Sequence, residues 1–190
     1  MPRWDPEGES RLREAALQLF LERGYENVTV AEITERAGLT RRTFSRYFAD
    51  KRDVLFAGSD ELPAVIGDRI RTADAALAPM EAVLAALDAV AERLADQAAI
   101  AARRQAVVRA SPELQERALT KFAVATDAAA DALRSRGVPA STATLLAQVA
   151  IAIFRTAFER WLNAPAEVSL RDRVRESAAE LSSSFGSQPS

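Results

Sequence analysis

The side chains with the clearest capacity for chemistry lie between residues 36 and 52, where six basic residues and one acidic residue stand among aromatic ones. Five of the six are arginines, whose planar guanidinium groups suit phosphate oxygens and the edge of guanine. The whole chain is slightly acidic, with a formal net charge of −2. A local basic patch on an acidic chain is typical of a surface that contacts nucleic-acid phosphates. The alternative is an amphipathic helix pair whose arginines are merely solvated.

The amino-acid composition excludes several other kinds of functional site. The 190 residues include no cysteine and no histidine, so disulfides, thiolate nucleophiles, the commonest general base and the commonest transition-metal ligand are absent. We therefore expect no metal, no cofactor and no enzymatic activity. An enzyme built on carboxylates or arginines, and a helical interaction module whose basic patch meets an acidic partner, remain alternatives. A steep salt dependence of binding to duplex DNA would separate a DNA-binding protein from both.

Two short helices joined by a tight turn are predicted to carry the basic patch. Thr29 and Glu32 have the spacing of a capping box, which starts a helix. Gly38 supplies the left-handed conformation that ends it, and Thr40 is a favourable N-cap for the next helix. Residues 29–51 therefore have the pattern of a helix-turn-helix.

The second of these helices is the expected DNA reader, because a helix-turn-helix reaches base edges with the first residues of its second helix. Arg41 or Arg42 is expected to contact a base, whereas Thr29, Tyr47 and Lys51 are expected to contact phosphates. The full set of expected DNA-binding residues is Thr29, Thr40, Arg41, Arg42, Thr43, Ser45, Arg46, Tyr47 and Lys51.

The segment AEITERAGLTRRTFSRYFADK, preceded by REAALQLFLERGYENVTV, resembles the N-terminal domain of TetR-type regulators over about residues 10–55. The resemblance implies a dimeric repressor that leaves a palindromic double-stranded operator when an effector binds. The chain departs from the family pattern at Ser45, where an aromatic residue is usual, and at Arg42, where a small residue or proline is frequent. The operator sequence is therefore not transferable from a relative.

Helix boundaries around the motif follow from capping residues. Ser10 is expected to cap the first helix and Gly24 to end it. Asp50 is expected to cap a fourth helix, whose free N–H groups and Lys51 would form a phosphate site. That helix should continue to Ile70, with a kink or interruption around Pro63.

Helical periodicity continues to the end of the chain, so the predicted fold class is all-α. We expect a three-helix helix-turn-helix domain over residues 1–56 and a helical effector-binding and dimerisation domain over residues 57–190. Within the second domain, helices are expected over residues 80–98, 100–110, 112–137, 141–163 and from 169 onward.

The segment from Ser141 to Asn163 is apolar on nearly all sides, so it must be buried on nearly all sides. One side can pack on its own domain and another on a second copy, although a central helix of a monomer would have the same pattern. The TetR resemblance also implies a homodimer through the last two long helices. The expected interface residues are Val149, Ile153, Ala157, Val174 and Leu181.

Aromatic residues of the second domain could line an effector pocket, although such residues more often fill a core. The chain also resembles, more loosely, a TetR subgroup with segments like SPELxxR and FxRTAFERWL, some of whose members sense fatty acyl-CoA. This resemblance implies a largely apolar effector, an acyl-CoA or another anionic amphiphile. The arginines near the middle of the domain could bind its anionic group, unless they are only solvated. The expected pocket residues are Phe122, Phe154, Phe158, Trp161, Arg103 and Arg104.

Neither the N-terminal residues nor the longest apolar run predicts export or membrane insertion. The first ten residues, MPRWDPEGES, are polar and of mixed charge, unlike a signal peptide. The longest apolar run, from Leu145 to Phe154, is about half the length that a membrane span needs. We therefore expect a cytoplasmic protein without a membrane partner.

Overall fold

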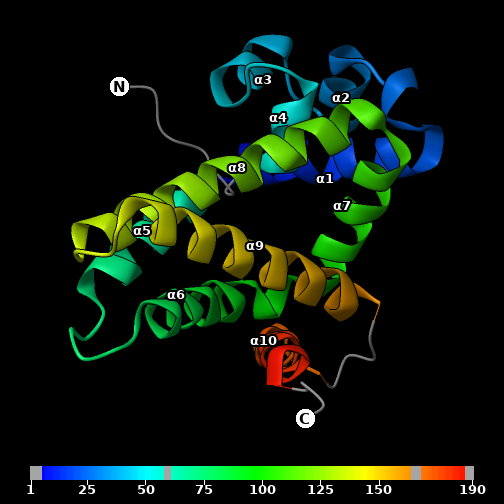
Figure 1. Ribbon diagram of the computed structural model, residues 1–190. Coiled ribbons are helices and arrows are strands. Elements are labelled where there is room, and N and C mark those ends of the chain that lie inside the picture. Colours follow the sequence, from blue (N-terminus) through cyan, green and yellow to red (C-terminus); the bar gives the residue numbers. More distant parts are fainter. Residues whose placement is uncertain (1–5, 58–60, 164–167, 187–190) are drawn as a thin grey trace. The chain divides into compact units, whose positions relative to one another are not determined.

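The computed structural model describes residues 6–57, 61–163 and 168–186, and every regular element in these ranges is helical (Figure 1). The prediction of an all-α fold is confirmed. The chain divides into two compact units, of which the first comprises residues 1–60 and 99–119 and the second comprises residues 61–98 and 120–190. The expected division into residues 1–56 and 57–190 differs from these units, because residues 99–119 group with the N-terminal stretch.

The first unit is built around α1 (Pro6–Arg23), which packs against three short helices. These are α2 (Val30–Ala37), α3 (Arg41–Tyr47) and α4 (Lys51–Phe56), and a single 3-10 turn, η1 (Tyr25–Asn27), joins α1 to α2. The unit also contains α7 (Ala98–Ala110) and the beginning of α8 (Pro112–Ser135). Apolar side chains from all these helices form one buried core: Leu12, Ala16, Leu19, Phe20, Val28, Ile33, Phe44, Phe48, Val54, Leu55, Val107, Val108 and Leu114.

Capping residues set the boundaries of α2 and α3 as the sequence predicts. The Thr29 hydroxyl accepts from the Glu32 N–H while the Glu32 carboxylate accepts from the Thr29 N–H, which completes the capping box. Gly38 ends α2 with a φ of 64°, a conformation that favours glycine. Thr40 then caps α3 by accepting from the Thr43 N–H. Local sequence therefore sets where the two helices of the helix-turn-helix begin and where the first one ends.

The start of α1 and the course of α4 differ from the expectation. α1 begins at Pro6, so Ser10 lies inside the helix and does not cap it. A proline in the first turn followed by Glu7 and Glu9 is a favourable start, because acidic residues complement the helix dipole. The helix that begins at Lys51 ends at Phe56, and a separate helix, α5 (Leu62–Thr72), begins with Pro63 in its first turn.

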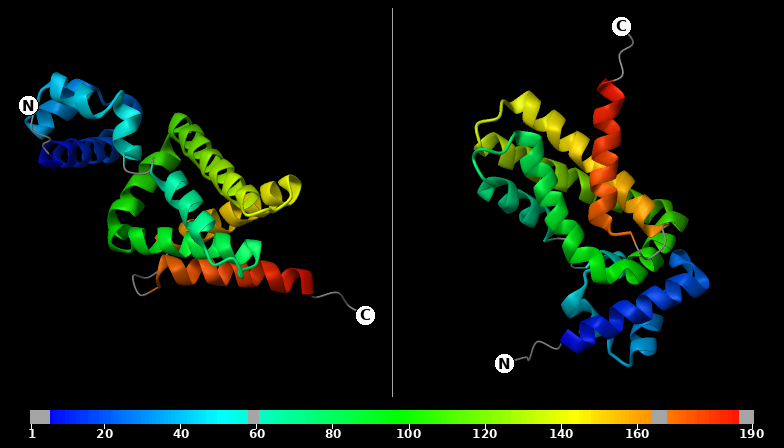
Figure 2. Two further views of the ribbon diagram at one scale, coloured as in Figure 1. Left: turned by 90° about the vertical axis from the view of Figure 1, so that its left-hand side faces the viewer. Right: turned by 90° about the horizontal axis from the view of Figure 1, so that it is seen from below.

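The second unit packs α5, α6 (Pro79–Leu94), the remainder of α8, α9 (Ala140–Leu162) and α10 (Leu170–Gly186), as Figure 2 shows from two sides. The short turn η2 (Ala95–Gln97) follows α6. α9 contacts both α10 and α6, and α6 contacts α5 and α10. Four alanines of α9 are fully buried: Ala143, Ala147, Ala150 and Ala157. Small side chains at these positions let the helix axes approach closely.

One arginine fixes the connection between α5 and α6. The Arg136 guanidinium donates to the carbonyls of Ile70 and Ala73 through one nitrogen, and to those of Asp74 and Leu77 through the other. Its distances to the Ala73 and Asp74 oxygens are 2.6 and 2.8 Å. Gly137 follows the end of α8 with a φ of 85°, the left-handed conformation expected of a glycine that ends a helix.

α9 extends beyond the apolar run Leu145–Phe154 and nearly coincides with the helix expected over residues 141–163. Within the described part of the chain it is the one helix that could cross a membrane by length and composition alone. Such a test is also passed by core helices, and 44% of its apolar window is buried inside the protein. Its contacts with α6 and α10 account for its composition.

Candidate functional site

The exposed face of α3 carries three guanidinium groups around a shallow hollow. Phe44 is buried and holds the helix on its unit, which turns Arg41, Arg42 and Arg46 outward. An open hollow of about 510 Å³ is lined by Arg42, Thr43, Ser45 and Arg46. The small Ser45 side chain stands between the two arginines, at the position where the TetR resemblance leads one to expect an aromatic ring.

The six basic residues of the predicted patch fall into two groups. The Arg36 guanidinium forms a two-pronged ion pair with Glu22 at 2.9 and 3.0 Å. The Arg52 guanidinium bonds to Asp50 and also lies 3.2 Å from the Glu113 carboxylate. Lys51, discussed below, is bound within the unit as well. The external cations of the patch are therefore those of α3.

Arg41 and Arg42 form no hydrogen bond or ion pair with any residue that the structure describes. Arg46 is held in a different way, because its guanidinium donates to the Tyr47 hydroxyl at 2.6 Å and lies 4.7 Å from the centre of that ring. The guanidinium N–H groups of Arg41 and Arg42 are therefore unpaired within the described part of the chain. Both residues lie in the first turn of α3, where a helix-turn-helix contacts bases.

Two of the threonines among the expected DNA-binding residues, Thr29 and Thr40, act within the unit as helix caps. The Thr29 hydroxyl also donates to the Glu32 carboxylate at 2.7 Å, and these hydrogen bonds hold the pKa of Glu32 below its usual range. The Thr40 and Thr43 hydroxyl oxygens are 3.0 Å apart. These groups therefore fix the orientation of α2 and α3 relative to the turn.

Lys51 differs from its expected role. Its ammonium donates to the carbonyls of Tyr25 and Val28 at 2.9 and 3.1 Å, and lies 4.2 Å from the centre of the Tyr25 ring. The N–H groups at the start of α4 are also occupied, because the Asp50 carboxylate accepts from those of Arg52 and Asp53. The expected phosphate site is corrected accordingly: both of its components are used to anchor α4.

Arg11 is a positioning residue that the sequence did not reveal as one. Its guanidinium donates to the Ala37 carbonyl at 2.7 and 3.1 Å and to the Gly38 carbonyl at 3.2 Å. These bonds tie α1 to the turn between α2 and α3. The partners are backbone atoms, so no acidic residue in the sequence indicates the pairing.

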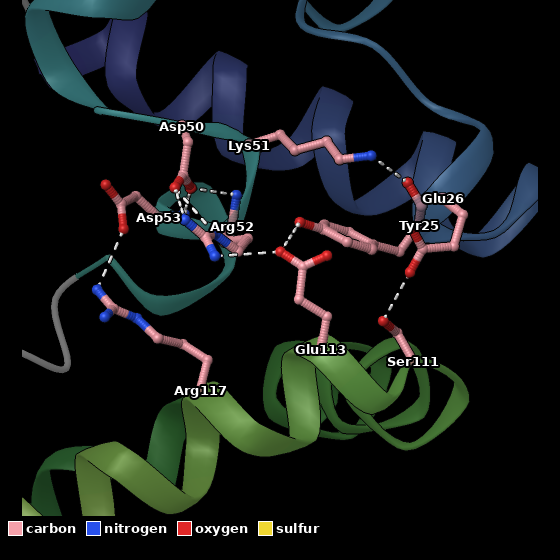
Figure 3. A network of polar contacts seen from close by, with 9 residues as sticks. All are labelled: Tyr25, Glu26, Asp50, Lys51, Arg52, Asp53, Ser111, Glu113 and Arg117. Atoms are coloured by element: carbon pink, nitrogen blue, oxygen red, sulfur yellow. Dashed lines mark hydrogen bonds and ion pairs between the residues drawn. The ribbon is translucent and has the colours of Figure 1, made fainter.

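A polar network joins the start of α8 to α4 and η1 inside the first unit (Figure 3). The Tyr25 hydroxyl donates to Glu113 at 3.3 Å, and Ser111 donates to Glu26 at 3.0 Å. Burial, and then the charge of Glu113, raise the pKa of Tyr25. The Arg117 guanidinium lies 3.5 Å from Asp53. The network places the α7–α8 junction against the helices that support the DNA-binding face.

Three of the aromatic residues expected in the effector pocket lie together on α9. The Phe154 and Phe158 rings stack with their centres 6.1 Å apart, and Trp161 lies 5.8 Å from Phe158. Each keeps 7–8% of its surface exposed, and all three lie on the same buried side of α9 as its fully buried alanines. Phe122 of α8 is half-buried, and the Arg155 guanidinium of α9 lies 5.3 Å from its ring centre. These four residues belong to the second unit, whereas Arg103 and Arg104 belong to the first.

Most of the residues expected to face a second copy are already covered within the single chain. Ile153, Ala157 and Val174 are buried, which contradicts their expected exposure to a partner. Val149 and Leu181 are half-buried and retain surface. The helical periodicity of α9 explains why Ile153 and Ala157 are covered. They lie on its buried side, whereas Leu145 and Ala152 lie on the exposed side.

Comparison with protein families gives two matches that together cover most of the chain. Residues 12–57 match the family described as bacterial regulatory proteins of the tetR family, and residues 77–186 match the MftR C-terminal domain.

Two curated relatives are transcriptional regulators. MftR of Mycobacterium tuberculosis, named for mycofactocin biosynthesis, is 28% identical over 158 residues, which span 80% of this chain and 78% of MftR. The HTH-type regulator TcmR of Streptomyces glaucescens is 35% identical over 81 residues, which span 43% of this chain but only 36% of TcmR.

Solved structures share the fold over nearly the whole chain. SmeT in complex with triclosan, from Stenotrophomonas maltophilia, has a TM-score of 0.66 at 18% identity and covers 91% of this chain and 90% of its own. FadR of Thermus thermophilus in complex with lauroyl-CoA has a TM-score of 0.55 at 22% identity and covers 91% and 92%. The free arginines of α3, the capped helix-turn-helix that presents them and the two family matches lead to one conclusion: the chain is a DNA-binding transcriptional regulator of the TetR family with an MftR-type C-terminal domain.

Proposed function

We propose that this regulator reads its operator through Arg41 and Arg42 and contacts the flanking phosphates through Arg46 and Tyr47. The observation that supports this assignment is the division of the basic patch. Arg36, Lys51 and Arg52 are bound inside the unit, whereas the two arginines that begin α3 have no hydrogen bond or ion pair to the part of the chain that the structure describes. A guanidinium can bond to both O6 and N7 of guanine, which makes guanine the expected base.

Binding of arginine variants to operator DNA tests the assignment. Arg42→Ala and Arg41→Ala should each be measured against a selected set of operator sequences. The variant that loses a base contact should bind about 1–3 kcal/mol more weakly and lose preference at one position in each half-site.

Arg36→Gln is the matched control, since it removes the same charge from an arginine paired with Glu22. It should leave the preferred operator unchanged. If neither α3 variant alters the preferred sequence, the base-reading role belongs to other residues.

We also propose that the protein acts as a homodimer on a palindromic operator. A single helix-turn-helix covers one short half-site, and two-fold dimers that present two such helices are the usual arrangement. Exposed apolar side chains remain on the last two helices, among them Leu145 of α9 and Phe185 of α10. These residues, together with Val149 and Leu181, replace the buried ones as interface candidates.

The effector that we propose is a largely apolar molecule that contacts Phe154, Phe158 and Trp161 and causes release of the operator. The support is the group of three adjacent rings on the buried side of α9, each of which retains 7–8% of its surface exposed. The FadR structure contains lauroyl-CoA and the SmeT structure contains triclosan, so proteins of this fold accept both an acyl chain and an aromatic phenol. The acyl-CoA complex favours an acyl chain.

A thermal-shift screen of acyl-CoAs, free fatty acids and chlorinated phenols tests this proposal, followed by operator release for each hit. A true effector should stabilise the protein by about 2.7 kcal/mol at a hundredfold excess over its dissociation constant. Phe158→Leu should weaken this response, whereas Phe185→Leu, on an exposed ring of α10, should not. Hits restricted to cationic compounds would contradict the assignment of an apolar site.

A further inference from the structure

The hollow on the exposed face of α3 contains a serine to which the proposed operator contacts give no role. Ser45 is exposed and lies three positions after Arg42 and four after Arg41. Residues with this spacing share one face of a helix, with Cβ atoms about 5–6 Å apart. Successive base pairs of DNA are about 3.4 Å apart. A base pair next to the guanine proposed for these arginines would therefore face Ser45 and the hollow around it.

Two of the four residues that line the hollow are held in place by contacts within the first unit. The Arg46 guanidinium is bound to the Tyr47 hydroxyl at 2.6 Å and lies 4.7 Å from the centre of that ring. The Thr43 hydroxyl lies 3.0 Å from that of Thr40, whose oxygen also accepts from the Thr43 N–H. The hollow therefore has a fixed wall and a fixed floor.

The groups that remain for a ligand are one hydroxyl and hydrocarbon. The Thr43 hydroxyl is engaged at the cap of α3, whereas that of Ser45 makes no hydrogen bond within the described part of the chain. Apolar surface comes from the stems of Arg42 and Arg46 and from the methyl group of Thr43. The hollow therefore offers a donor beside an apolar surface.

Thymine presents the matching edge in the major groove. Among the four bases it alone carries a methyl group there, next to the O4 acceptor. A serine hydroxyl can donate to O4 while the methyl group leaves water for the apolar surface of the hollow. A larger side chain at position 45 would occupy this space, so the small size of Ser45 is what admits the methyl group.

We propose that Ser45 is a specificity-determining residue, whose hollow selects a thymine beside the guanine read by the arginines of α3. The inference rests on the proposed reading of the operator by α3, and it adds a second specified base to each half-site. It assigns this base to the shape of the hollow, whereas the guanine is assigned to guanidinium hydrogen bonds.

Replacement of thymine by uracil tests the proposal, because uracil lacks only the methyl group. A duplex selected by the native protein from random sequences is prepared with each thymine replaced in turn, and binding is measured by fluorescence anisotropy at constant salt. In each half-site, uracil beside the guanine that depends on Arg41 or Arg42 should weaken binding about fourfold, as expected for the loss of one buried methyl group.

Variants at position 45 assign the effect to the hollow. Ser45→Leu fills the hollow and should bind the thymine and uracil duplexes equally. Ser45→Ala keeps the hollow open and should retain most of the difference between them. Ser141→Leu, at an exposed serine of α9, is the matched control and should retain the full difference. Melting temperatures of the variants identify any loss of folding, and the uracil series with the native protein does not depend on a variant.

The proposal is overturned if no uracil replacement weakens binding of the native protein, or if Ser45→Leu still distinguishes thymine from uracil. It is also overturned if Ser45→Leu weakens binding to all duplexes equally, because the hollow would then contact the sugar-phosphate backbone. The guanine preference of Arg41→Ala and Arg42→Ala is a separate readout. An altered preference with no uracil effect would retain base reading by α3 and remove only the role of Ser45.

Discussion

The charged end of the Lys51 side chain contacts two backbone carbonyls and an aromatic ring of the first unit. Its ammonium bonds to the carbonyls of Tyr25 and Val28, which would otherwise lack a partner of the same strength, and faces the Tyr25 ring. Hydrogen bonds from a charged donor contribute more to stability than neutral ones. The residue therefore joins the start of α4 to the segment between α1 and α2.

Lys51→Met should lower the free energy of unfolding by about 1–3 kcal/mol, because it leaves the two carbonyls without this donor. The salt dependence of operator binding should keep its slope. Urea unfolding and binding at several salt concentrations measure the two quantities. Arg46→Gln is the reciprocal control, which should flatten the salt dependence and leave stability nearly unchanged. A flattened salt dependence in Lys51→Met would restore the phosphate contact that the sequence suggested.

Residue types and spacing were sufficient to find the DNA-binding helix. They were not sufficient to show which basic residues of the patch are paired inside the unit and which face outward. Arg41 and Arg42 are marked by their place in the first turn after a cap. The fate of Arg36 and Arg52 depends on Glu22 and Glu113, which are distant in sequence and meet them only through packing. Arg11 is harder still, because its acceptors are main-chain carbonyls.

At the scale of elements, α4 depends on a single acidic cap. The Asp50 carboxylate accepts from two N–H groups at the start of the helix and bonds to the Arg52 guanidinium. The hydrogen bond from Arg52, followed by those from the two N–H groups, holds the pKa of Asp50 below its usual range. Asp50 therefore contributes stability when it is ionised.

Acid should weaken the protein partly through Asp50. A carboxyl group whose pKa is lower in the folded state stabilises fully above its unfolded pKa, about 4, and loses that contribution as the pH falls through the folded value. Urea unfolding between pH 6 and pH 2 should give a shallower loss of stability for Asp50→Asn than for the native protein. Asp127→Asn, at an exposed position of α8, should follow the native curve. Parallel curves for both variants would assign the acid sensitivity to other carboxylates.

Element boundaries were predictable where a cap acts on its own helix. Thr29, Gly38 and Thr40 have local partners and were recognised correctly. Ser10 is a good cap that is not used, because Pro6 starts the helix earlier. A competing start signal explains this miss.

At the scale of the whole molecule, oligomeric state depends on which sides of α9 and α10 are left uncovered. Apolar composition predicted that α9 is buried on nearly all sides, whereas one side of the helix is exposed in the single chain. The sequence could not show which side faces its own unit. Burial of Ile153 and Ala157 answers that question and leaves Leu145 as the largest exposed apolar side chain of the helix.

Leu145→Asp should convert a homodimer into monomers, because a charge would be buried at an apolar interface. Sedimentation at micromolar concentration measures the mass, and operator binding should weaken in parallel. Leu21→Asp is the control, since Leu21 is a similarly exposed leucine of α1. A native protein that sediments as a monomer, or a dimer that survives the Leu145 change, would place the interface elsewhere.

The Arg136 clamp has a consequence for how sequences of this kind diverge. Its four acceptors are carbonyls, so the side chains at positions 70, 73, 74 and 77 can change without breaking the contact. Pairs of side chains that touch tend to change together during evolution, but a side chain that binds main-chain atoms has no partner to change with it. Covariation between positions would therefore miss this contact, and Arg136 would be visible only as an invariant residue beside a variable loop.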